Sequence, residues 1–130
     1  MPKLYAHYSR FNGHWLWPDF SPREVACRHC GELYLDPVAM DALQALRRAW
    51  GKAIVINSGH RCAVHNAAVG GLATSRHLTI AFDCACLAAD QDSFANLALA
   101  VGFTGIGWYA RQNFMHLDMR PVQSFWWGKA

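Results

Sequence analysis

Two pairs of histidine and aspartate residues give this sequence its clearest chemical signal. His77 and Asp83 lie near the two ends of SRHLTIAFD, and His116 and Asp118 lie together in FMHLD. Side chains two residues apart on a strand point to the same face, so a strand here would place His116 and Asp118 together. If the strand that carries Asp83 lies beside it, two imidazoles and one carboxylate meet at one point.

Two imidazoles and one carboxylate are the ligands of a hydrolytic zinc ion, which keeps its fourth position open for water. Zinc makes that water a nucleophile at neutral pH and polarises a carbonyl group. A lone histidine is more often an ordinary surface or core residue. On spacing alone, the metal site formed by His77, Asp83 and His116 and the ordinary interpretation both remain open.

Arg61 is a further candidate, because it comes just after a predicted buried strand and hence at the mouth of any cleft above the sheet. A guanidinium group at that place binds a substrate carboxylate through two parallel hydrogen bonds. Taken alone, Arg61 is better interpreted as an ordinary exposed arginine.

The elements that must position these residues predict a small α+β domain, with a mainly antiparallel sheet packed against helices. A helix is predicted over residues 37–50, capped by Asp36 and ended by Gly51, with apolar residues recurring on one face. A second helix follows Asp90 or Asp92 and closes at Gly102. Strands are predicted over residues 53–57, 79–85, 104–109 and 114–119, the last two joined as a hairpin.

Length and composition indicate one domain over residues 1–130, with an irregular arm over 1–25 and a core over 26–130. The chain has 130 residues, 53% of them hydrophobic, and a net charge of +3. No apolar run approaches ~18 residues, so a membrane-spanning helix is not expected. The start MPKLYAHYSRF lacks the apolar run of a signal peptide, and we expect no Sec export. The basic residues are scattered, which disfavours nucleic-acid binding.

The cysteines leave several interpretations open. Cys27 and Cys30 form the CxxC segment CRHC, but a structural zinc ion needs two more ligands. Cys62, Cys84 and Cys86 do not supply a second CxxC. Free thiols, a disulfide and metal binding therefore all remain possible for these five residues.

Longer segments resemble a known family. The string SGHRCAVHNAAVGGLATSRHLTIAFD resembles the first motif block of the zinc D-Ala-D-Ala carboxypeptidase and murein endopeptidase family, and FMHLDMRP resembles its second block. The upstream segment FSPREVACRHCGELYLDP resembles the entry segment of the small phage and prophage-type branch. The resemblance spans roughly residues 20–127. It implies the α+β fold of hedgehog and D-Ala-D-Ala peptidases.

The resemblance also assigns roles to individual residues. It implies that His77, Asp83 and His116 bind one catalytic Zn²⁺ ion. It implies that Arg61 holds a carboxylate or a peptide carbonyl of the substrate. Ser75 is expected in the substrate pocket, together with His60, which stands where the family usually has tyrosine.

Two departures from the family pattern bear on the chemistry. Asp83 follows His77 by six residues, where the family usually has seven, so irregular backbone near His77 must absorb the difference. Many members carry an acid as general base three residues before the last zinc ligand, and this chain has Asn113 there. Asp118 is the best available carboxylate, either as a catalytic base or as a partner that orients an imidazole.

The sequence therefore predicts a zinc metallopeptidase that hydrolyses peptidoglycan stem peptides, of the D-Ala-D-Ala carboxypeptidase or the endopeptidase and endolysin type. The alternative is a non-catalytic module of the same fold that binds cell-wall peptides or serves in a virion, which the missing acid at Asn113 favours. We expect a monomer that is made in the cytoplasm without a Sec signal and reaches the cell wall by phage-type delivery.

Overall fold

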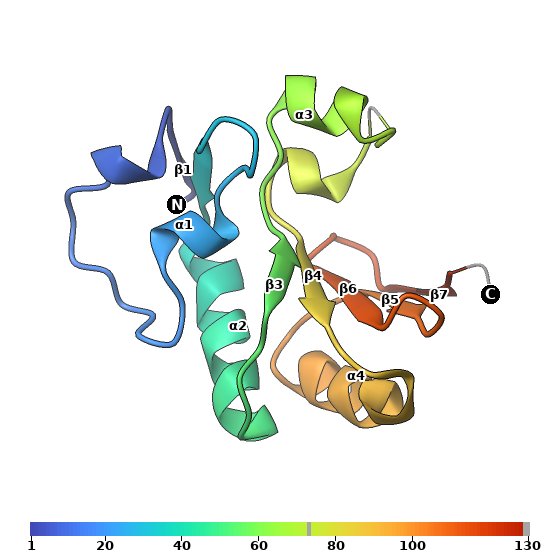
Figure 1. The fold of residues 1–130 in the computed structure, drawn as a ribbon. Coiled ribbons are helices and arrows are strands. Elements are labelled where there is room, and N and C mark those ends of the chain that lie inside the picture. The colour runs from blue at the N-terminus through green and yellow to red at the C-terminus, as the bar shows by residue number, and fades with distance from the viewer. Residues whose placement is uncertain (73, 129–130) are drawn as a thin grey trace.

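The computed structural model describes residues 1–72 and 74–128, so Ala73 and the last two residues of the predicted domain lie outside the described part (Figure 1). The helices are α1 (Pro22–Val25), α2 (Pro37–Trp50), α3 (Ala63–Ala68) and α4 (Gln91–Ala100). Single 3-10 turns cover Tyr8–Arg10, Arg76–Leu78 and Ala88–Asp90. The strands are β1 (Lys3–Tyr5), β2 (Leu33–Leu35), β3 (Ile56–Ser58), β4 (Phe82–Ala85), β5 (Gly105–Tyr109), β6 (Phe114–Asp118) and β7 (Ser124–Trp127).

The main sheet has five strands in the order β3-β4-β6-β5-β7. β4 pairs antiparallel with both β3 and β6, and β6 pairs antiparallel with β5, whereas β5 and β7 run parallel. The strands β1 and β2 form a separate antiparallel pair. The predicted α+β class with a mainly antiparallel sheet is confirmed.

Local signals account for the boundaries of α2. The Asp36 carboxylate accepts a hydrogen bond from the Val38 amide at 3.0 Å, and proline occupies the first helical position. Gly51 ends the helix in the left-handed conformation at φ +73°, which a glycine adopts at no steric cost. The predicted helix over residues 37–50 is thus observed with the same limits.

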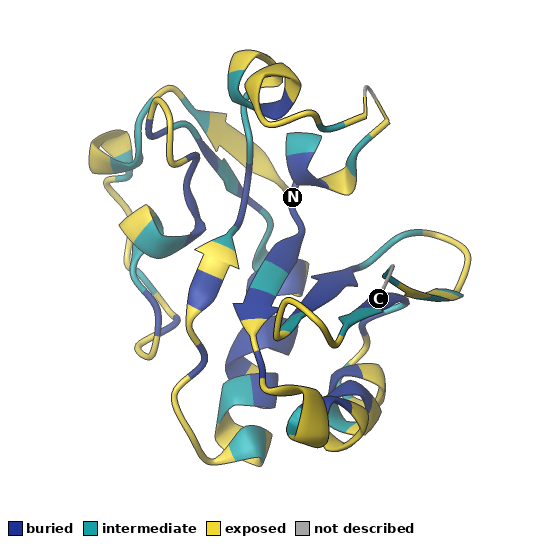
Figure 2. Cartoon of the chain, turned by 45° about the vertical axis from the view of Figure 1, so that its right-hand side comes forward, coloured by how far each residue is buried: buried dark blue, intermediate teal, exposed yellow. Residues whose placement is uncertain are grey.

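The two faces of the main sheet have different roles. Phe82 and Cys84 of β4, and Met115 and Leu117 of β6, are buried in one core cluster with residues of α2 and α4. Figure 2 shows this burial along the central strands and on the inner sides of the two helices, while α3 is mostly exposed. Alternation along a strand turns Asp83 and the neighbouring His116 to the opposite face.

Some elements differ from the sequence-based expectation. The arm over residues 1–25 is not wholly irregular, because β1 pairs with β2. The helix α1 agrees with the sequence, in which Ser21 stands three residues before Glu24 and predicts a capped helix start. The structure also contains α3 and β7, neither of which was predicted from the sequence. These elements are short and are held by long-range pairing or by a cap, so periodicity gives little sign of them. No helix in the described part of the chain is both long enough and apolar enough to span a membrane.

Candidate metal centre

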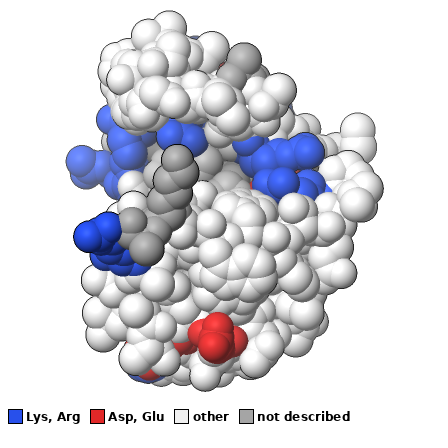
Figure 3. All heavy atoms as spheres, turned by 90° about the vertical axis from the view of Figure 1, so that its right-hand side faces the viewer, with Lys and Arg blue, Asp and Glu red and all other residues white. Residues whose placement is uncertain are grey.

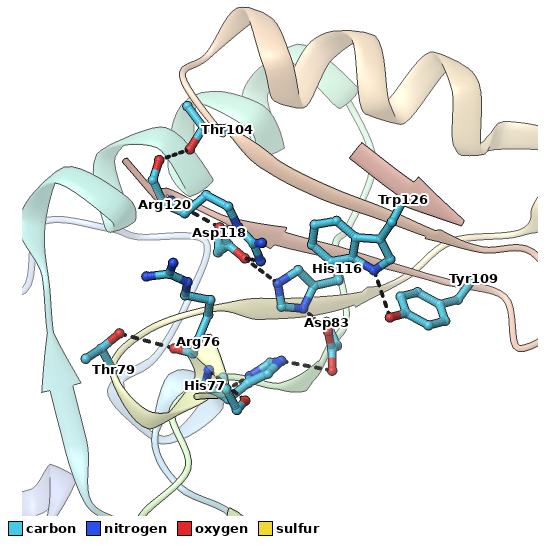
Figure 4. Close-up of polar contacts among 12 residues, drawn as sticks. Arg76, His77, Thr79, Asp83, Thr104, Tyr109, His116, Asp118, Arg120 and Trp126 are labelled. Atoms are coloured by element: carbon cyan, nitrogen blue, oxygen red, sulfur yellow. Dashed lines mark hydrogen bonds and ion pairs between the residues drawn. The ribbon is translucent and has the colours of Figure 1, made fainter. Parts of the chain in front are cut away.

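Neighbouring strands of the main sheet bring two of the predicted ligands together. Asp83 on β4 lies directly opposite His116 on β6 in the antiparallel register. Nδ1 of His116 is 3.1 Å from Oδ1 of Asp83 and forms a hydrogen bond with it. Both side chains lie on the sheet face that α2 and α4 leave uncovered (Figure 4).

The third predicted ligand, His77, comes from the 3-10 turn Arg76–Leu78. The Ser75 hydroxyl caps this turn by accepting a hydrogen bond from the His77 amide at 3.2 Å. Nδ1 of His77 lies 2.6 Å from the carbonyl oxygen of Gly59, which fixes the direction of the ring. Nε2 of His77 then lies 3.2 Å from Oδ2 of Asp83, so the carboxylate stands between the two imidazoles.

Irregular backbone between His77 and β4 compensates for the short spacing between His77 and Asp83, as the sequence predicts. After the 3-10 turn, Thr79 takes an irregular conformation at φ −111° and ψ −101°, and β4 begins only at Phe82. The register between β3 and β4 also shifts between Ile56 and Ser58. These irregularities let Asp83 face His77 although the segment is one residue shorter than the family pattern.

The three side chains fit a zinc ion. One donor atom from each of His77, Asp83 and His116 lies within 4.8 Å of the others. His77 is buried, and its Nε2 atom makes no well-aligned hydrogen bond although Oδ2 of Asp83 lies 3.2 Å away, which is rare for a buried polar atom; a metal ion bound there would satisfy this nitrogen. The other nitrogens of both rings are held by protein acceptors, as is usual for zinc-binding histidines.

The charges of the site reinforce one another. Burial opposes ionisation of Asp83, but the hydrogen bond with His116 and the contact with His77 outweigh it and lower the pKa of the carboxyl group to about 2. Burial alone would lower the pKa of His116, yet its bonds to Asp118 and Asp83 raise that pKa above the ordinary value. Asp83 is therefore ionised at neutral pH, as a metal ligand must be.

Asp118 lies on the other side of the His116 ring. Its Oδ2 atom is 2.6 Å from Nε2 of His116, and the carboxylate also accepts hydrogen bonds from Arg120 Nε at 2.8 Å and Nη2 at 2.6 Å. Burial opposes ionisation, but the bonds from Arg120 and His116 lower the pKa of Asp118 strongly. Of the two roles considered for Asp118, this geometry favours orienting the imidazole over catalytic proton transfer.

A cleft of about 560 Å³ opens above His77, Asp83 and His116. Its remaining lining residues are Arg61, Gly70, Gly71, Leu72, Thr74, Ser75, Arg76, Tyr109, Phe114, Arg120 and Trp126. Figure 3 shows lysine and arginine side chains on both sides of the hollow on this face, whereas the main acidic patch of this view lies near its bottom, away from the hollow. Among the described residues that line the cleft, Asp83 is the one carboxylate.

Two of the predicted substrate residues lie in this cleft, close to His77. Nη2 of Arg61 donates a hydrogen bond to the Ser75 hydroxyl at 3.1 Å, and the same hydroxyl caps the turn of His77. Nε of Arg61 is buried and has no hydrogen-bond partner among the described residues. Arg61 is thus held at one end and has an unused donor.

His60 and Asn113 do not reach the cleft. His60 is 2% exposed, and its ring contacts the Thr79 carbonyl oxygen and, at 2.7 Å, Oε1 of Glu32. The structure therefore places His60 away from the position expected for substrate contact, because its ring turns to Glu32 and to the Thr79 carbonyl oxygen. The side chain of Asn113 accepts a hydrogen bond from the Ala88 amide at 3.0 Å on the hairpin.

Sequence reasoning did not assign Arg76, Tyr109 and Arg120 to the cleft, whereas Trp126 lies in the cleft wall as its aromatic character suggested. Arg120 stacks its guanidinium group on the Trp126 ring at 4.6 Å, and Nε1 of Trp126 donates to the Tyr109 hydroxyl at 2.9 Å. Arg76 adjoins the SRH motif and Arg120 follows HLDM, so proximity to the ligand histidines was the available signal.

Comparison with known proteins agrees with this geometry. A family model described as peptidase M15 matches residues 18–118, a range that includes the three clustered side chains and Arg61. A search of curated proteins finds no match. Peptidases of the M15 family are zinc metallopeptidases, and a match over most of the chain shows that this protein belongs to the peptidase M15 family.

Proposed function

We propose that the protein is a zinc metallopeptidase that hydrolyses the stem peptides of peptidoglycan, as a D-Ala-D-Ala carboxypeptidase or an endopeptidase. The observation that carries the proposal is the unpartnered Nε2 atom of His77. It faces the carboxylate of Asp83, which His116 contacts from the other side, at the base of a cleft lined by arginines.

Each ligand side chain is held from outside the site. The Gly59 carbonyl oxygen fixes the ring of His77, and Asp118 fixes the ring of His116. Zinc bound to these side chains would supply a water nucleophile at neutral pH and a Lewis acid for the scissile carbonyl group. Because these contacts already orient the two rings, the side chains would not need to rearrange on binding the ion.

The cleft has the charge that a stem peptide requires. Such peptides carry free carboxylates, including the terminal carboxylate of D-alanine. Arg61, Arg76 and Arg120 line the cleft, and Arg61 has an unused buried donor beside His77. A guanidinium group in a partly dry cleft binds a carboxylate through charge-assisted hydrogen bonds. This supports Arg61 as the residue that positions the substrate.

One observation favours the alternative of a non-catalytic module that binds wall peptides. No carboxylate besides Asp83 lines the described cleft, and Asp118 is already bonded to His116 and Arg120. A catalytic base of the common carboxylate type is therefore not placed opposite the candidate ligands. If this module binds without cleaving, it still acts at the cell wall, where we also expect the peptidase to act after phage-type delivery.

The test combines metal analysis with digestion of purified peptidoglycan. The His77→Ala and His116→Ala variants should each hold one zinc ion fewer per chain than the wild type and lose hydrolysis. The His14→Ala variant is the control, because His14 is exposed and lies outside the cleft. Mass spectrometry of the products distinguishes release of D-alanine from cleavage inside the peptide.

The outcomes separate the two functions. If both histidine variants lose zinc and the zinc-loaded wild type also leaves every wall peptide intact, the binding module is favoured. Unchanged zinc content in both variants would refute the assigned ligands. A substrate with an amidated C-terminus serves as a further control, since a carboxypeptidase that recognises the terminal carboxylate should not cleave it.

A further inference from the structure

A second group of potential metal ligands lies away from the cleft. Cys27 and Cys30 follow α1, and Cys62 caps the N-terminus of α3, yet their three sulfur atoms lie within 4.8 Å of one another. None of the three lines the cleft above His77. All three are free thiols in the structure. The CxxC segment of Cys27 and Cys30 is visible in the sequence, whereas the position of Cys62 beside them depends on the fold.

Two histidines stand beside these sulfurs. Nδ1 of His29 lies 3.9 Å from Sγ of Cys62. The His29 ring stacks on the ring of His65, with centroids 5.6 Å apart and an angle of 6° between the planes. His65 follows Cys62 by three residues on the first turn of α3, and side chains at that spacing share one side of a helix.

We propose that Cys27, Cys30, Cys62 and one imidazole of the stacked His29 and His65 pair form a structural zinc site. Three thiolates and one imidazole are an established ligand set for structural zinc, and four protein ligands close the coordination shell. This differs from the three-residue site in the cleft, which leaves a position for substrate.

The distances require little movement. Two thiolates bound to one tetrahedral zinc ion at ~2.3 Å lie about 3.8 Å apart, and a thiolate and an imidazole lie about 3.6 Å apart. The sulfur atoms already lie within 4.8 Å of one another, and His29 is 3.9 Å from Cys62. The three sulfurs therefore need only small shifts to share one ion, and His29 or His65 would turn toward them to supply the fourth ligand.

The backbone around the sulfurs is shaped for thiolates. The Cys62 amide donates to Sγ of Cys27, and the His65 amide donates to Sγ of Cys62, each at 3.4 Å. The chain between Cys27 and Cys30 turns back on itself, with the Gly31 amide donating to the Cys27 carbonyl oxygen at 2.8 Å and Gly31 at φ +80°. Amides directed at sulfur favour its ionised form.

Binding at this site involves no change of oxidation state. The Zn²⁺ ion forms three bonds to sulfur and one to nitrogen, the three thiols release three protons to solvent, and the imidazole binds in its neutral form. Zinc affinity at the cysteines should therefore increase with pH.

The site would fix the segment that supports His77. Arg61 directly precedes Cys62, and the Arg61 amide donates to the His77 carbonyl oxygen at 2.6 Å. The Gly59 carbonyl oxygen holds the His77 ring. On the other side, the His60 amide donates to the Val25 carbonyl oxygen at 2.9 Å, close to Cys27. Zinc at the cysteines would therefore tie the end of α1 to the segment over residues 59–62.

Cobalt substitution tests the proposal on the wild-type protein. Cobalt(II) bound by thiolates gives an intense sulfur-to-metal charge-transfer band, whereas the cleft site of His77, Asp83 and His116 contains no sulfur. We expect this band in the wild type and in the His77→Ala variant. Its absence from reduced, cobalt-loaded wild-type protein would overturn the proposal, and this result is independent of whether the cleft binds zinc or cleaves peptides.

Zinc content and stability provide the second measurement. The reduced wild type should hold two zinc ions per chain, and Cys30→Ser should hold one and unfold at a lower temperature. Cys30 is exposed, so serine in its place leaves the core intact. Cys86→Ala, outside the cluster, should keep both ions. Equal zinc content in the wild type and in Cys30→Ser would contradict the proposal.

The identity of the fourth ligand and the oxidised alternative are tested separately. One of the variants His29→Ala and His65→Ala should weaken zinc binding at the cysteines at least tenfold, and no effect in either would exclude the imidazole ligand. A disulfide among the three cysteines would lower the mass of the purified protein by two hydrogens. Finding that disulfide in protein isolated without added oxidant would refute the zinc site.

Discussion

Nε2 of His116 lies 2.6 Å from Oδ2 of Asp118, two residues further along β6, and the ring reaches Asp83 with its other nitrogen. This contact assigns the two nitrogens of His116 to different tasks. Once the proton on Nδ1 leaves, the hydrogen that stays on Nε2 is held by Asp118, and the lone pair of Nδ1 points to the side where Asp83 and His77 lie. Asp118 is in turn held by two nitrogens of Arg120, so the orientation of the ring is set by the sheet.

The first prediction concerns Asp118 as a positioning residue. Asp118→Asn keeps an acceptor for His116 but removes the charge, so the affinity of the cleft site for zinc should fall roughly 10- to 100-fold. Competition with a chromogenic chelator measures this loss. Asp92→Asn is the control, because Asp92 is exposed and accepts a hydrogen bond from Trp108 away from the site.

If Asp118 were instead the catalytic base, the same variant would bind zinc normally and lose turnover alone. Zinc affinity and kcat are therefore measured on one preparation. Normal affinity with lost turnover would reject the positioning role.

The second prediction uses the close approach of Gly105 to the Asp118 carboxylate. A Cβ atom added at Gly105 would overlap Oδ1 of Asp118 and would lie 2.5 Å from Nε of Arg120. Gly105→Ala should therefore displace Asp118 and weaken zinc binding at the cleft as Asp118→Asn does. Gly13→Ala, at an exposed position, is the control. A zinc affinity equal to that of the wild type would show that Asp118 need not hold its observed position.

The third prediction is a pH dependence of zinc binding. The proton on metal-free His116 must leave before the ring can coordinate, and its pKa is raised above 6.5. Affinity at the cleft should therefore decline by about tenfold per pH unit below that raised pKa, with the decline starting above pH 6.5. Chelator competition across about pH 5 to 8 follows it, with Cys30→Ser used to remove the other proposed site. Asp118→Asn should move the onset to lower pH.

The fourth prediction concerns the stability of the metal-free protein. The pKa of Asp83 is lowered to about 2 from 3.8, so this group stabilises the fold above about pH 4 and ceases to do so as the pH falls toward 2. The raised pKa of His116 acts in the opposite direction, stabilising the fold below pH 6.5 and losing this effect as the pH rises through the folded-state value. The free energy of unfolding in urea should be highest between these limits. A continued rise above pH 6.5 would contradict it.

The fifth prediction concerns substrate binding by Arg61. Lysine cannot reproduce the paired donors of a guanidinium group, so Arg61→Lys should lower kcat/KM about tenfold, equivalent to the loss of roughly 1.5 kcal/mol from a charged hydrogen bond. The effect should appear in KM. Arg111→Lys, on the exposed hairpin connection, should behave as the wild type. If Arg61→Lys leaves KM unchanged, Arg61 does not hold the substrate.

The sequence was informative wherever local chemistry decides the outcome. Asp36, Pro37 and Gly51 define α2 by capping and backbone preference alone. The meeting of Asp83 and His116 followed from strand alternation, given that the two strands pair. Contacts between segments far apart in the chain could not be predicted from the sequence. The parallel addition of β7 and the convergence of Cys62 on the CxxC segment depend on tertiary packing, for which local patterns carry no signal.

The inward position of His60 shows a different limit. The family pattern places an aromatic residue there, but in this chain the half-buried Glu32 accepts a hydrogen bond from the buried imidazole at 2.7 Å. A buried histidine needs hydrogen-bond partners, and the contacts with Glu32 and the Thr79 carbonyl oxygen supply them here. Which side it takes depends on Glu32, which lies 28 residues earlier in the chain.

The segments that carry the candidate ligands differ in local stability. Asp83 and His116 belong to a hydrogen-bonded ladder at the centre of the sheet, whereas His77 belongs to a 3-10 turn held by Ser75, Gly59 and Arg61. Segments with few ladder bonds open at a lower free-energy cost than the core strands. The turn can therefore open while the sheet stays intact, so an ion held by these side chains would exchange through a fluctuation of a few residues and would not require global unfolding.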